Sequence, residues 1–149
     1  MRNSLSSHYS QYCKVCESSS QNHVFKPNIQ FLPLGSHGDG EDFDGPGLIL
    51  AHAFYPNHGG DIHFDDSEAW TISSNSNRNS KMLLPVAVHE IGHSLGLKHS
   101  SAPGSIMNKY YSVQSSNVIL DDDDVKGIHS IYGMSFLKFS LPFSFIRWP

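Results

Sequence analysis

Hydrophobic residues in the first half of the chain come in short runs separated by stretches rich in glycine, proline and aspartate. Short apolar runs bounded by turn-forming residues are typical of strands. They predict strands within residues 23–34, 48–54 and 61–64. Pro27 and Pro33 weaken the first of these, because proline donates no hydrogen bond to a neighbouring strand. The intervening residues 35–47 predict a loop and residues 56–60 a turn.

The second half of the chain changes to an apolar pattern with helical spacing, which predicts a helix over residues 85–95. Pro85 suits the first turn of a helix, and Gly96 follows where helices commonly end on a residue with positive φ. A second helix is predicted over about residues 121–132, since its opening aspartates suit the positive end of the helix dipole. The polar residues 71–81 predict a surface loop.

The two ends of the chain differ from its middle. Residues 1–21 are rich in serine and lack periodicity, which favours a loop or disorder and leaves this segment unassigned. Residues 22–134 carry all the predicted elements and read as one domain, and residues 135–149 form an apolar tail with no predicted role. The first ten residues are polar and do not resemble a secretory signal peptide, and no segment is long and apolar enough to span a membrane.

Composition adds two facts to this picture. The 149 residues carry a formal net charge of -4 with no long run of lysine or arginine, which argues against a nucleic-acid partner. The ten histidines exceed ordinary usage, and neutral imidazole is the commonest metal ligand in proteins. Cys13 and Cys16 form a lone C-x-x-C, which fits a redox pair or half a zinc site but, without a second pair, favours an incidental spacing.

One segment concentrates the histidine chemistry, and it reads HEIGHSLGLKH over residues 89–99. His89 and His93 are four residues apart, so a helix places both imidazoles on one face. Glu90 lies beside them without ligating, where a general base for a metal-bound water belongs. Gly96 lets the chain turn so that His99 supplies a third nitrogen. Three nitrogens and a water make an open, catalytic zinc site.

The alternative is a helix that carries these histidines by chance. H-E-x-x-H alone recurs by chance, but the extension to H-E-x-x-H-x-x-G-x-x-H is far more specific. The extended motif also requires a methionine turn downstream, and Met107 supplies it. Taken alone, Met107 would read as ordinary core packing.

These residues resemble the metzincin metalloproteases and, among them, the matrixins (matrix metalloproteinases). Blocks upstream and downstream extend the resemblance from about residue 22 to residue 133. They are HGDG, FDGPG, LAHAF and HFDDSEAW at residues 37–40, 43–47, 50–54 and 63–70, and DD, GI and IYG at 123–124, 127–128 and 131–133. The resemblance implies an α+β fold: a twisted mixed β-sheet with an active-site helix and a C-terminal helix.

The resemblance implies a zinc-dependent metalloendopeptidase that hydrolyses peptide bonds of extracellular proteins. Glu90 would activate a zinc-bound water, and His89, His93 and His99 would hold the catalytic zinc. The implied protein is secreted, monomeric, and takes an extended polypeptide, from the extracellular matrix or from other secreted proteins, as its substrate.

Further metal ions are implied by the same resemblance. A structural zinc would be held by His37, Asp39, His52 and His63, which suit a closed tetrahedral shell. A calcium ion would be held by side chains of Asp44, Asp65 and Glu68 and by backbone carbonyls of Gly45, Gly47 and Ile49. The alternative for this acidic loop is a solvated turn. A second calcium site would involve Gly59 and Asp61, although a family aspartate is replaced by Asn28.

The resemblance also indicates where a substrate would bind. An edge strand around Leu50 and Ala51 would pair with the peptide backbone, and Tyr111 would form a wall of the specificity pocket. Lys109 stands where the family has a proline, and Pro85 occupies a helix position that helps shape the pocket.

The family's first strand and first helix are not recognisable in residues 1–21, which suggests an incomplete or mis-assembled matrixin. Exposed apolar surface would then be expected where that helix packs. The alternative function is therefore a non-catalytic zinc- and calcium-binding fragment with an intact metal site. Another metzincin branch is a third hypothesis, against which the blocks at residues 37–70 argue.

Overall fold

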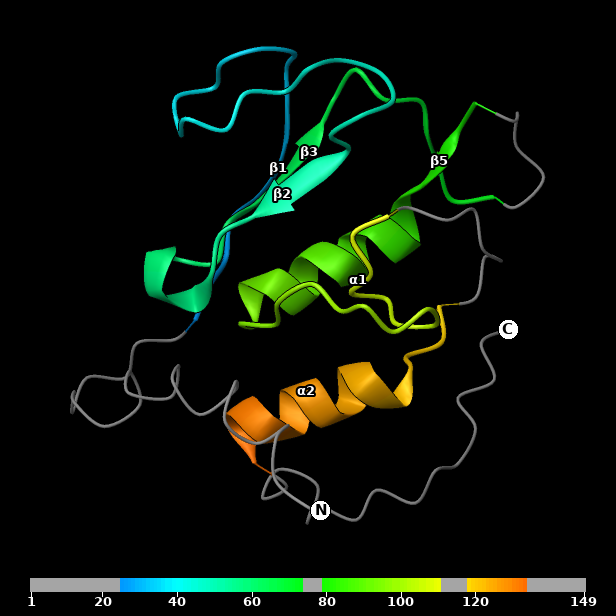
Figure 1. Ribbon diagram of the computed structural model, residues 1–149. Coiled ribbons are helices and arrows are strands. Elements are labelled where there is room, and N and C mark those ends of the chain that lie inside the picture. Colours follow the sequence, from blue (N-terminus) through cyan, green and yellow to red (C-terminus); the bar gives the residue numbers. More distant parts are fainter. Residues whose placement is uncertain (1–24, 74–78, 111–117, 134–149) are drawn as a thin grey trace, which may run out of the picture.

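The computed structural model describes residues 25–73, 79–110 and 118–133. These residues form a small mixed β-sheet, and the helix α1 (Leu83–Ser94) packs against one face of it. A second helix, α2 (Asp122–Tyr132), lies on the far side of α1, and part of the segment 95–110 runs between the two helices (Figure 1). This arrangement confirms the predicted α+β fold.

The main sheet contains β1 (Ile29–Leu32), β3 (Ile62–Asp65) and β2 (Ala51–Ala53), in that spatial order. β1 runs parallel to β3, whereas β2 runs antiparallel to it, which makes the sheet mixed. β1 and β2 lie within their predicted ranges and are shorter, whereas β3 is shifted by one residue and ends at Asp65, just beyond the predicted range. Within the described sheet β2 is an edge strand, because only one of its sides is paired with another strand.

The predicted turn at residues 56–60 contains a short 3-10 helix, Pro56–His58, which ends at Gly59 with a φ of 99°. The predicted surface loop at residues 71–81 is only partly correct. Its two ends form a parallel pair of two-residue strands, β4 (Trp70–Thr71) and β5 (Lys81–Met82). Strands of this length carry no alternation that a sequence pattern could reveal.

Helix α1 begins at Leu83 rather than at the predicted Pro85. Proline tolerates any position in the first turn, where backbone N–H groups have no intrahelical partner, so it could not fix the boundary. The helix ends at Ser94, one residue before the predicted end, and Gly96 follows with the expected positive φ, 101°. Its N–H donates to the carbonyl of His93 at 2.8 Å, which closes the last turn.

Helix α2 begins at Asp122, and Asp121 is its N-cap residue. The Asp121 side chain accepts a hydrogen bond from the Asp123 N–H, and the Asp124 side chain accepts one from the Asp121 N–H. This reciprocal capping box explains the acidic start of the helix more specifically than the helix dipole does.

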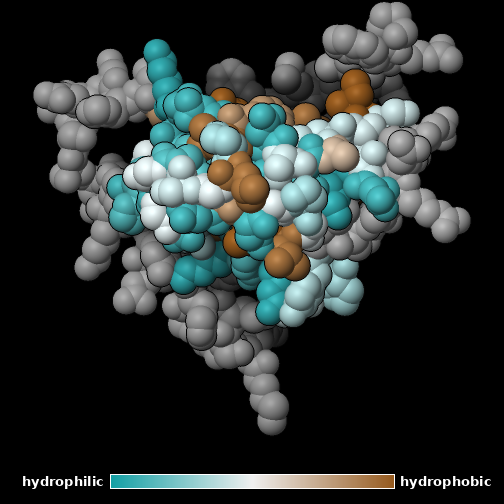
Figure 2. All heavy atoms as spheres, turned by 90° about the horizontal axis from the view of Figure 1, so that it is seen from above, coloured by the Kyte–Doolittle hydropathy of each residue, from teal (hydrophilic) through white to brown (hydrophobic). Residues whose placement is uncertain are grey.

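The core lies between the sheet and α1, and it is built around Ile62, Phe64 and Val86. On β1, Ile29 and Phe31 remain about half exposed, at 56% and 47%. Seen from above, hydrophobic residues form several separate groups among hydrophilic ones (Figure 2). Neither described helix has the length and apolar character of a membrane span.

Candidate metal centres and active site

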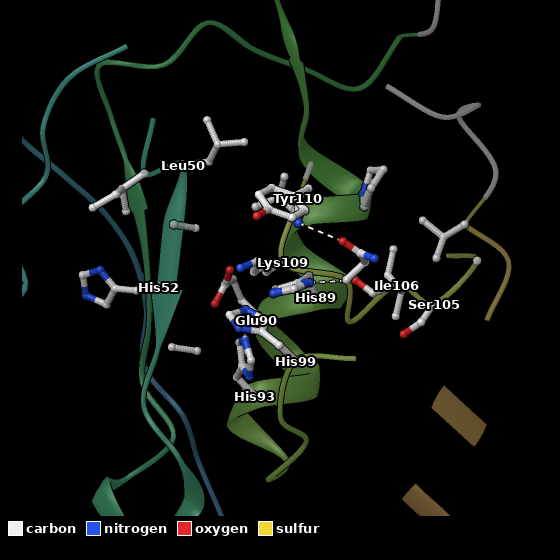
Figure 3. A pocket seen from close by; sticks show the side chains of 18 of the residues that line it. Leu50, His52, His89, Glu90, His93, His99, Ser105, Ile106, Lys109 and Tyr110 are labelled. Atoms are coloured by element: carbon white, nitrogen blue, oxygen red, sulfur yellow. Dashed lines mark hydrogen bonds between the residues drawn. The ribbon is translucent and has the colours of Figure 1, made fainter. Parts of the chain in front are cut away.

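Three histidines converge between the edge strand β2 and helix α1 (Figure 3). His89 and His93 lie one turn apart on α1, and His99 returns from the segment that follows Gly96. One nitrogen from each ring lies within 4.8 Å of the others. The Nε2 atoms of His93 and His99 are 3.1 Å apart, which brings two ring nitrogens face to face.

Backbone carbonyls orient two of these rings. His89 Nδ1 donates to the carbonyl of Ile106 at 2.7 Å, and His93 Nδ1 donates to the carbonyl of Leu97 at 2.8 Å. A carbonyl can only accept, so each Nδ1 carries the proton and each Nε2 carries a free lone pair. Such carbonyl partners are the usual outer shell of histidines that bind metals, and the residues therefore fit a zinc ion.

Electrostatics keep these imidazoles neutral. Burial, together with the neighbouring His89 and His99 rings, lowers the pKa of His93 to about 4. Burial also lowers the pKa of His89, and burial together with the positive charge of Lys109 lowers the pKa of His99. At neutral pH the three rings therefore hold their lone pairs available to a metal ion.

Glu90 is buried beside this cluster, with 5% of its surface exposed. Its Oε2 has no hydrogen-bond partner in the described part of the chain. Burial raises the pKa of Glu90 to about 7, so the carboxyl group is suited to both accept and release a proton near neutral pH. The carboxyl group lines a cleft of about 750 Å³ together with His89, His93 and His99.

Met107 is buried against α1, with 2% of its surface exposed. It packs so closely on α1 that a Cβ atom at Gly92 would overlap its sulfur and lie 3.0 Å from its Cε. Glycine at this position of the motif therefore lets the methionine approach the helix, as expected of the predicted methionine turn.

Asp124 connects helix α2 to this turn, and sequence reasoning assigned it no role in the site. The carboxylate is 4% exposed and accepts hydrogen bonds from the N–H groups of Ile106 and Met107 at 2.9 and 3.3 Å, and from the Ser105 hydroxyl. Because the Ile106 carbonyl accepts from His89, Asp124 fixes the peptide segment that orients a ring of the cluster.

The substitution Asp124→Asn is expected to lower the free energy of unfolding by about 1–3 kcal/mol. The amide keeps the size of the side chain but turns one acceptor into a donor that faces backbone N–H groups. Urea unfolding would measure the loss. Asp122→Asn is the matched control, because the Asp122 side chain on the same helix is 94% exposed. Equal effects of the two substitutions would contradict the role given to Asp124.

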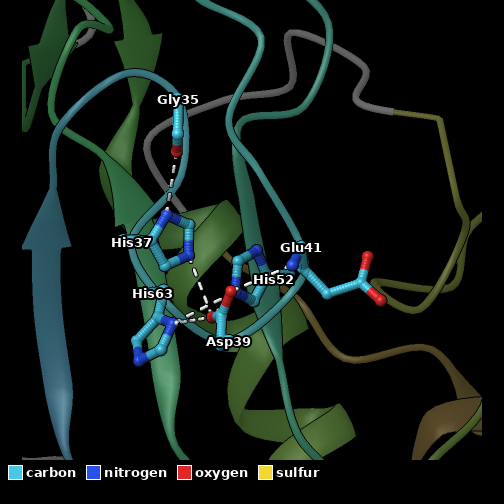
Figure 4. A network of polar contacts seen from close by, with 6 residues as sticks. All are labelled: Gly35, His37, Asp39, Glu41, His52 and His63. Atoms are coloured by element: carbon cyan, nitrogen blue, oxygen red, sulfur yellow. Dashed lines mark hydrogen bonds and ion pairs between the residues drawn. The ribbon is translucent and has the colours of Figure 1, made fainter.

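A second cluster lies on the other side of β2 and combines three histidines with Asp39 (Figure 4). Asp39 Oδ2 lies 2.9 Å from His37 Nε2, 3.0 Å from His52 Nε2 and 2.8 Å from His63 Nδ1. His52 and His63 are opposite each other on the antiparallel strands β2 and β3, and the loop after β1 supplies the other two residues.

The chemistry of this donor set fits a closed zinc site. His37 Nδ1 donates to the Gly35 carbonyl at 3.2 Å, so its Nε2 faces Asp39 with a lone pair and makes no hydrogen bond there. Burial alone would raise the pKa of Asp39, but hydrogen bonds from the Glu41 N–H and from His52 and His63 outweigh it and lower that pKa. The carboxylate is therefore charged, as a metal ligand must be.

The three acidic residues of the predicted first calcium site do not form a compact ligand group like the two histidine clusters within the described residues. Asp65 is 0% exposed, and its Oδ2 has no hydrogen-bond partner in the described part of the chain. The Glu68 carboxylate accepts from the Gly47 N–H, and the Asp44 carboxylate accepts from the Ile49 N–H at 3.1 Å. The unpaired buried oxygen of Asp65 is the feature that fits a cation.

The remaining predicted residues are placed as follows. Asp61, one of the two residues predicted for the second calcium site, accepts a hydrogen bond from the N–H of Asn28, which replaces the family aspartate, at 2.9 Å. Leu50 and Ala51 line the cleft at the edge of the sheet. Tyr111, Cys13 and Cys16, like the whole of the segments 1–21 and 135–149, lie outside the described residues.

The mixed sheet packs on a helix that carries the H-E-x-x-H residues, and these residues face an open cleft. This arrangement is typical of a metallopeptidase site. The matrixin family profile matches residues 14–133. The chain belongs to the matrixin family, whose members are zinc metalloendopeptidases.

Individual relatives agree with this assignment. The chain is 54% identical over 97 residues to the hatching enzyme of Paracentrotus lividus, which covers 65% of this chain and 16% of that protein. It is 53% identical over 111 residues to human neutrophil collagenase, covering 72% of this chain and 23% of the relative. It is 49% identical over 102 residues to human matrix metalloproteinase-16, covering 66% and 17%. The chain therefore matches less than a quarter of the length of these relatives.

Proposed function

We propose that this chain is a zinc-dependent metalloendopeptidase that hydrolyses peptide bonds of extracellular proteins, with Glu90 as the general base. The observation that carries the proposal is the position of Glu90. Its buried carboxyl group lines the same cleft as three ring nitrogens that lie within 4.8 Å of one another. Proton acceptor and metal ligands thus face a common space that is open to a peptide.

His89, His93 and His99 would hold the catalytic zinc. Zinc supplies a Lewis acid that polarises the scissile carbonyl and makes a water molecule more acidic. Glu90 takes the proton from the attacking water and later delivers it to the leaving amine. The Ile106 and Leu97 carbonyls hold the His89 and His93 rings in the tautomer that this arrangement needs.

The peptide substrate would bind in an extended conformation along the outer edge of β2, beside Leu50 and Ala51. Main-chain hydrogen bonds of this kind give affinity with little dependence on sequence. Tyr111 would contribute a wall of the specificity pocket. Pro85 and Val86 line the cleft from α1.

Two kinds of structural metal site complete the proposal. His37, Asp39, His52 and His63 would hold a second zinc that ties the loop after β1 to the sheet. Asp44, Asp65 and Glu68, with the carbonyls of Gly45, Gly47 and Ile49, would hold calcium, and Gly59 and Asp61 would take part in a second calcium site. The short hydrogen bond from the Gly47 N–H to the Glu68 carboxylate already joins two residues of the first calcium site. We further propose extracellular localisation and a monomeric state.

Cleavage of a peptide mixture by the purified chain, folded with zinc and calcium, tests the proposal. We expect internal peptide bonds to be cut, and a zinc chelator to stop cleavage until zinc is restored. Mass spectrometry of the products identifies the bonds. A folded chain that binds zinc yet cuts none of these peptides would favour a non-catalytic zinc- and calcium-binding protein instead.

A further inference from the structure

The described wall of the active-site cleft carries very little charge. Apart from histidines and tyrosines, two ionisable side chains line it, those of Glu90 and Lys109. Glu90 is buried, whereas Lys109 is exposed and therefore available to a bound peptide. The opposite wall, formed by the residues around Leu50 and Ala51 on the sheet edge, is uncharged.

Lys109 is held close to the reacting centre. It follows Met107 by two residues, and its positive charge acts on the His99 ring. Its ammonium nitrogen lies 4.8 Å from the centre of the Tyr110 ring, an aromatic contact that holds the cation on one side. Figure 3 shows Lys109 and Tyr110 beside the histidine cluster, along the space that a peptide would occupy.

No carboxylate in the described part of the chain lies within 4.0 Å of the Lys109 ammonium group. The sequence gives the reason, because it contains no aspartate or glutamate between Glu90 and Asp121. The lysine of α2 differs in this respect, since Lys126 lies 3.8 Å from Asp122. The charge of Lys109 is therefore left for a group that enters the cleft.

We propose that Lys109 is a specificity-determining residue that gives the cleft a subsite for an acidic side chain of the peptide substrate. This inference rests on the proposed peptidase function and names the class of substrate that the site prefers. A bound peptide excludes water from the cleft, which strengthens the attraction between the ammonium group and an aspartate or glutamate carboxylate.

Paired peptides that differ only by glutamate or glutamine at one position test the inference. All peptides are amidated at the C-terminus, so that a side chain supplies the carboxylate. At one position near the cleaved bond, we expect kcat/KM to favour glutamate by about fivefold at low salt, and less as ionic strength rises. In Lys109→Met the ratio should fall to about one. Lys109→Glu should cut a third peptide, with lysine at the same position, faster than the glutamine peptide.

Lys126→Met is the matched control, because this lysine is exposed on α2 and outside the cleft lining. It should keep the glutamate preference of the original chain. Circular dichroism shows whether the variants remain folded, as expected for substitutions of an exposed side chain. Equal cleavage of both peptides at every position, or an unchanged ratio in Lys109→Met, would overturn the inference.

Binding separates this inference from the proposed function. The same peptides, fluorescently labelled, are titrated into the Glu90→Ala chain, and anisotropy reports their affinities without cleavage. Tighter binding of the glutamate peptide that disappears in Glu90→Ala/Lys109→Met supports the subsite even if the original chain cuts nothing. Cleavage without any preference in rate or binding would leave the peptidase standing and remove the subsite. If the chain neither binds nor cuts the peptides, both the proposed peptidase function and the acidic subsite are overturned.

Discussion

Replacing His93 with alanine is expected to reduce the zinc content from about two ions per chain to about one and to abolish peptide cleavage. His93 is the central ring of its cluster: its ring centre lies 4.7 Å from those of both His89 and His99. Two imidazoles would remain, and they cannot complete a zinc shell. Since losing even an outer-shell partner costs about 10–100-fold in affinity, loss of this ligand should exceed 100-fold.

Zinc content after dialysis against a weak chelator, measured by atomic spectroscopy, checks this expectation. His52→Ala provides the reciprocal variant, because it removes a ligand of the other cluster. Each single variant should keep about one zinc, and the double variant none. His58→Ala, at an exposed position outside both clusters, should keep about two. If His93→Ala retained as much zinc as the original chain, the assignment of its cluster as the catalytic zinc site would be wrong.

The sequence was sufficient to predict the arrangement around α1, because the relevant signals are local. The four-residue spacing of His89 and His93 determines that a helix presents them on one face. Gly96 adopts the positive φ that the motif requires, and this places His99 within reach of the other two rings. The helix starts two residues before the prediction, since Pro85 is compatible with more than one boundary, and it ends one residue earlier.

The second cluster depended on a resemblance, and the structure shows why. His52 and His63 are opposite each other only because β2 and β3 pair in one particular register. A shift of a single residue would turn one ring to the other face of the sheet. Asp39 then reaches both rings from a loop whose path no local pattern specifies.

The supporting shell of the site was beyond sequence reasoning. The carbonyls of Ile106 and Leu97 orient the histidine rings, but every residue has a carbonyl, so its amino-acid type gives no sign of this role. Asp124 looked like one of several aspartates at a helix start. Its hydrogen bonds to the methionine turn connect residues 17 to 19 positions apart and become visible only in three dimensions.

The second large effect is expected at Glu90. Changing Glu90 to glutamine or alanine should reduce kcat for peptide cleavage by about 10²–10⁴-fold, because neither side chain can accept the proton of the attacking water. Zinc content should remain at about two ions per chain, since His89, His93 and His99 are unchanged. Stopped assays on a fluorogenic peptide would measure kcat, and atomic spectroscopy would measure the zinc.

Stability distinguishes a chemical role of Glu90 from a structural one. The Glu90 carboxyl group is buried, and its Oε2 lacks a partner among the described residues, so the neutral glutamine of Glu90→Gln should not lower the unfolding midpoint. Glu41→Gln, which alters an exposed carboxylate outside the cleft, should leave both kcat and stability unchanged. Normal turnover in Glu90→Gln would remove Glu90 as the general base. If Glu90→Gln lost zinc as well as turnover, Glu90 would instead support the metal centre. A residue that acts only on the attacking water would leave the three histidines able to bind zinc.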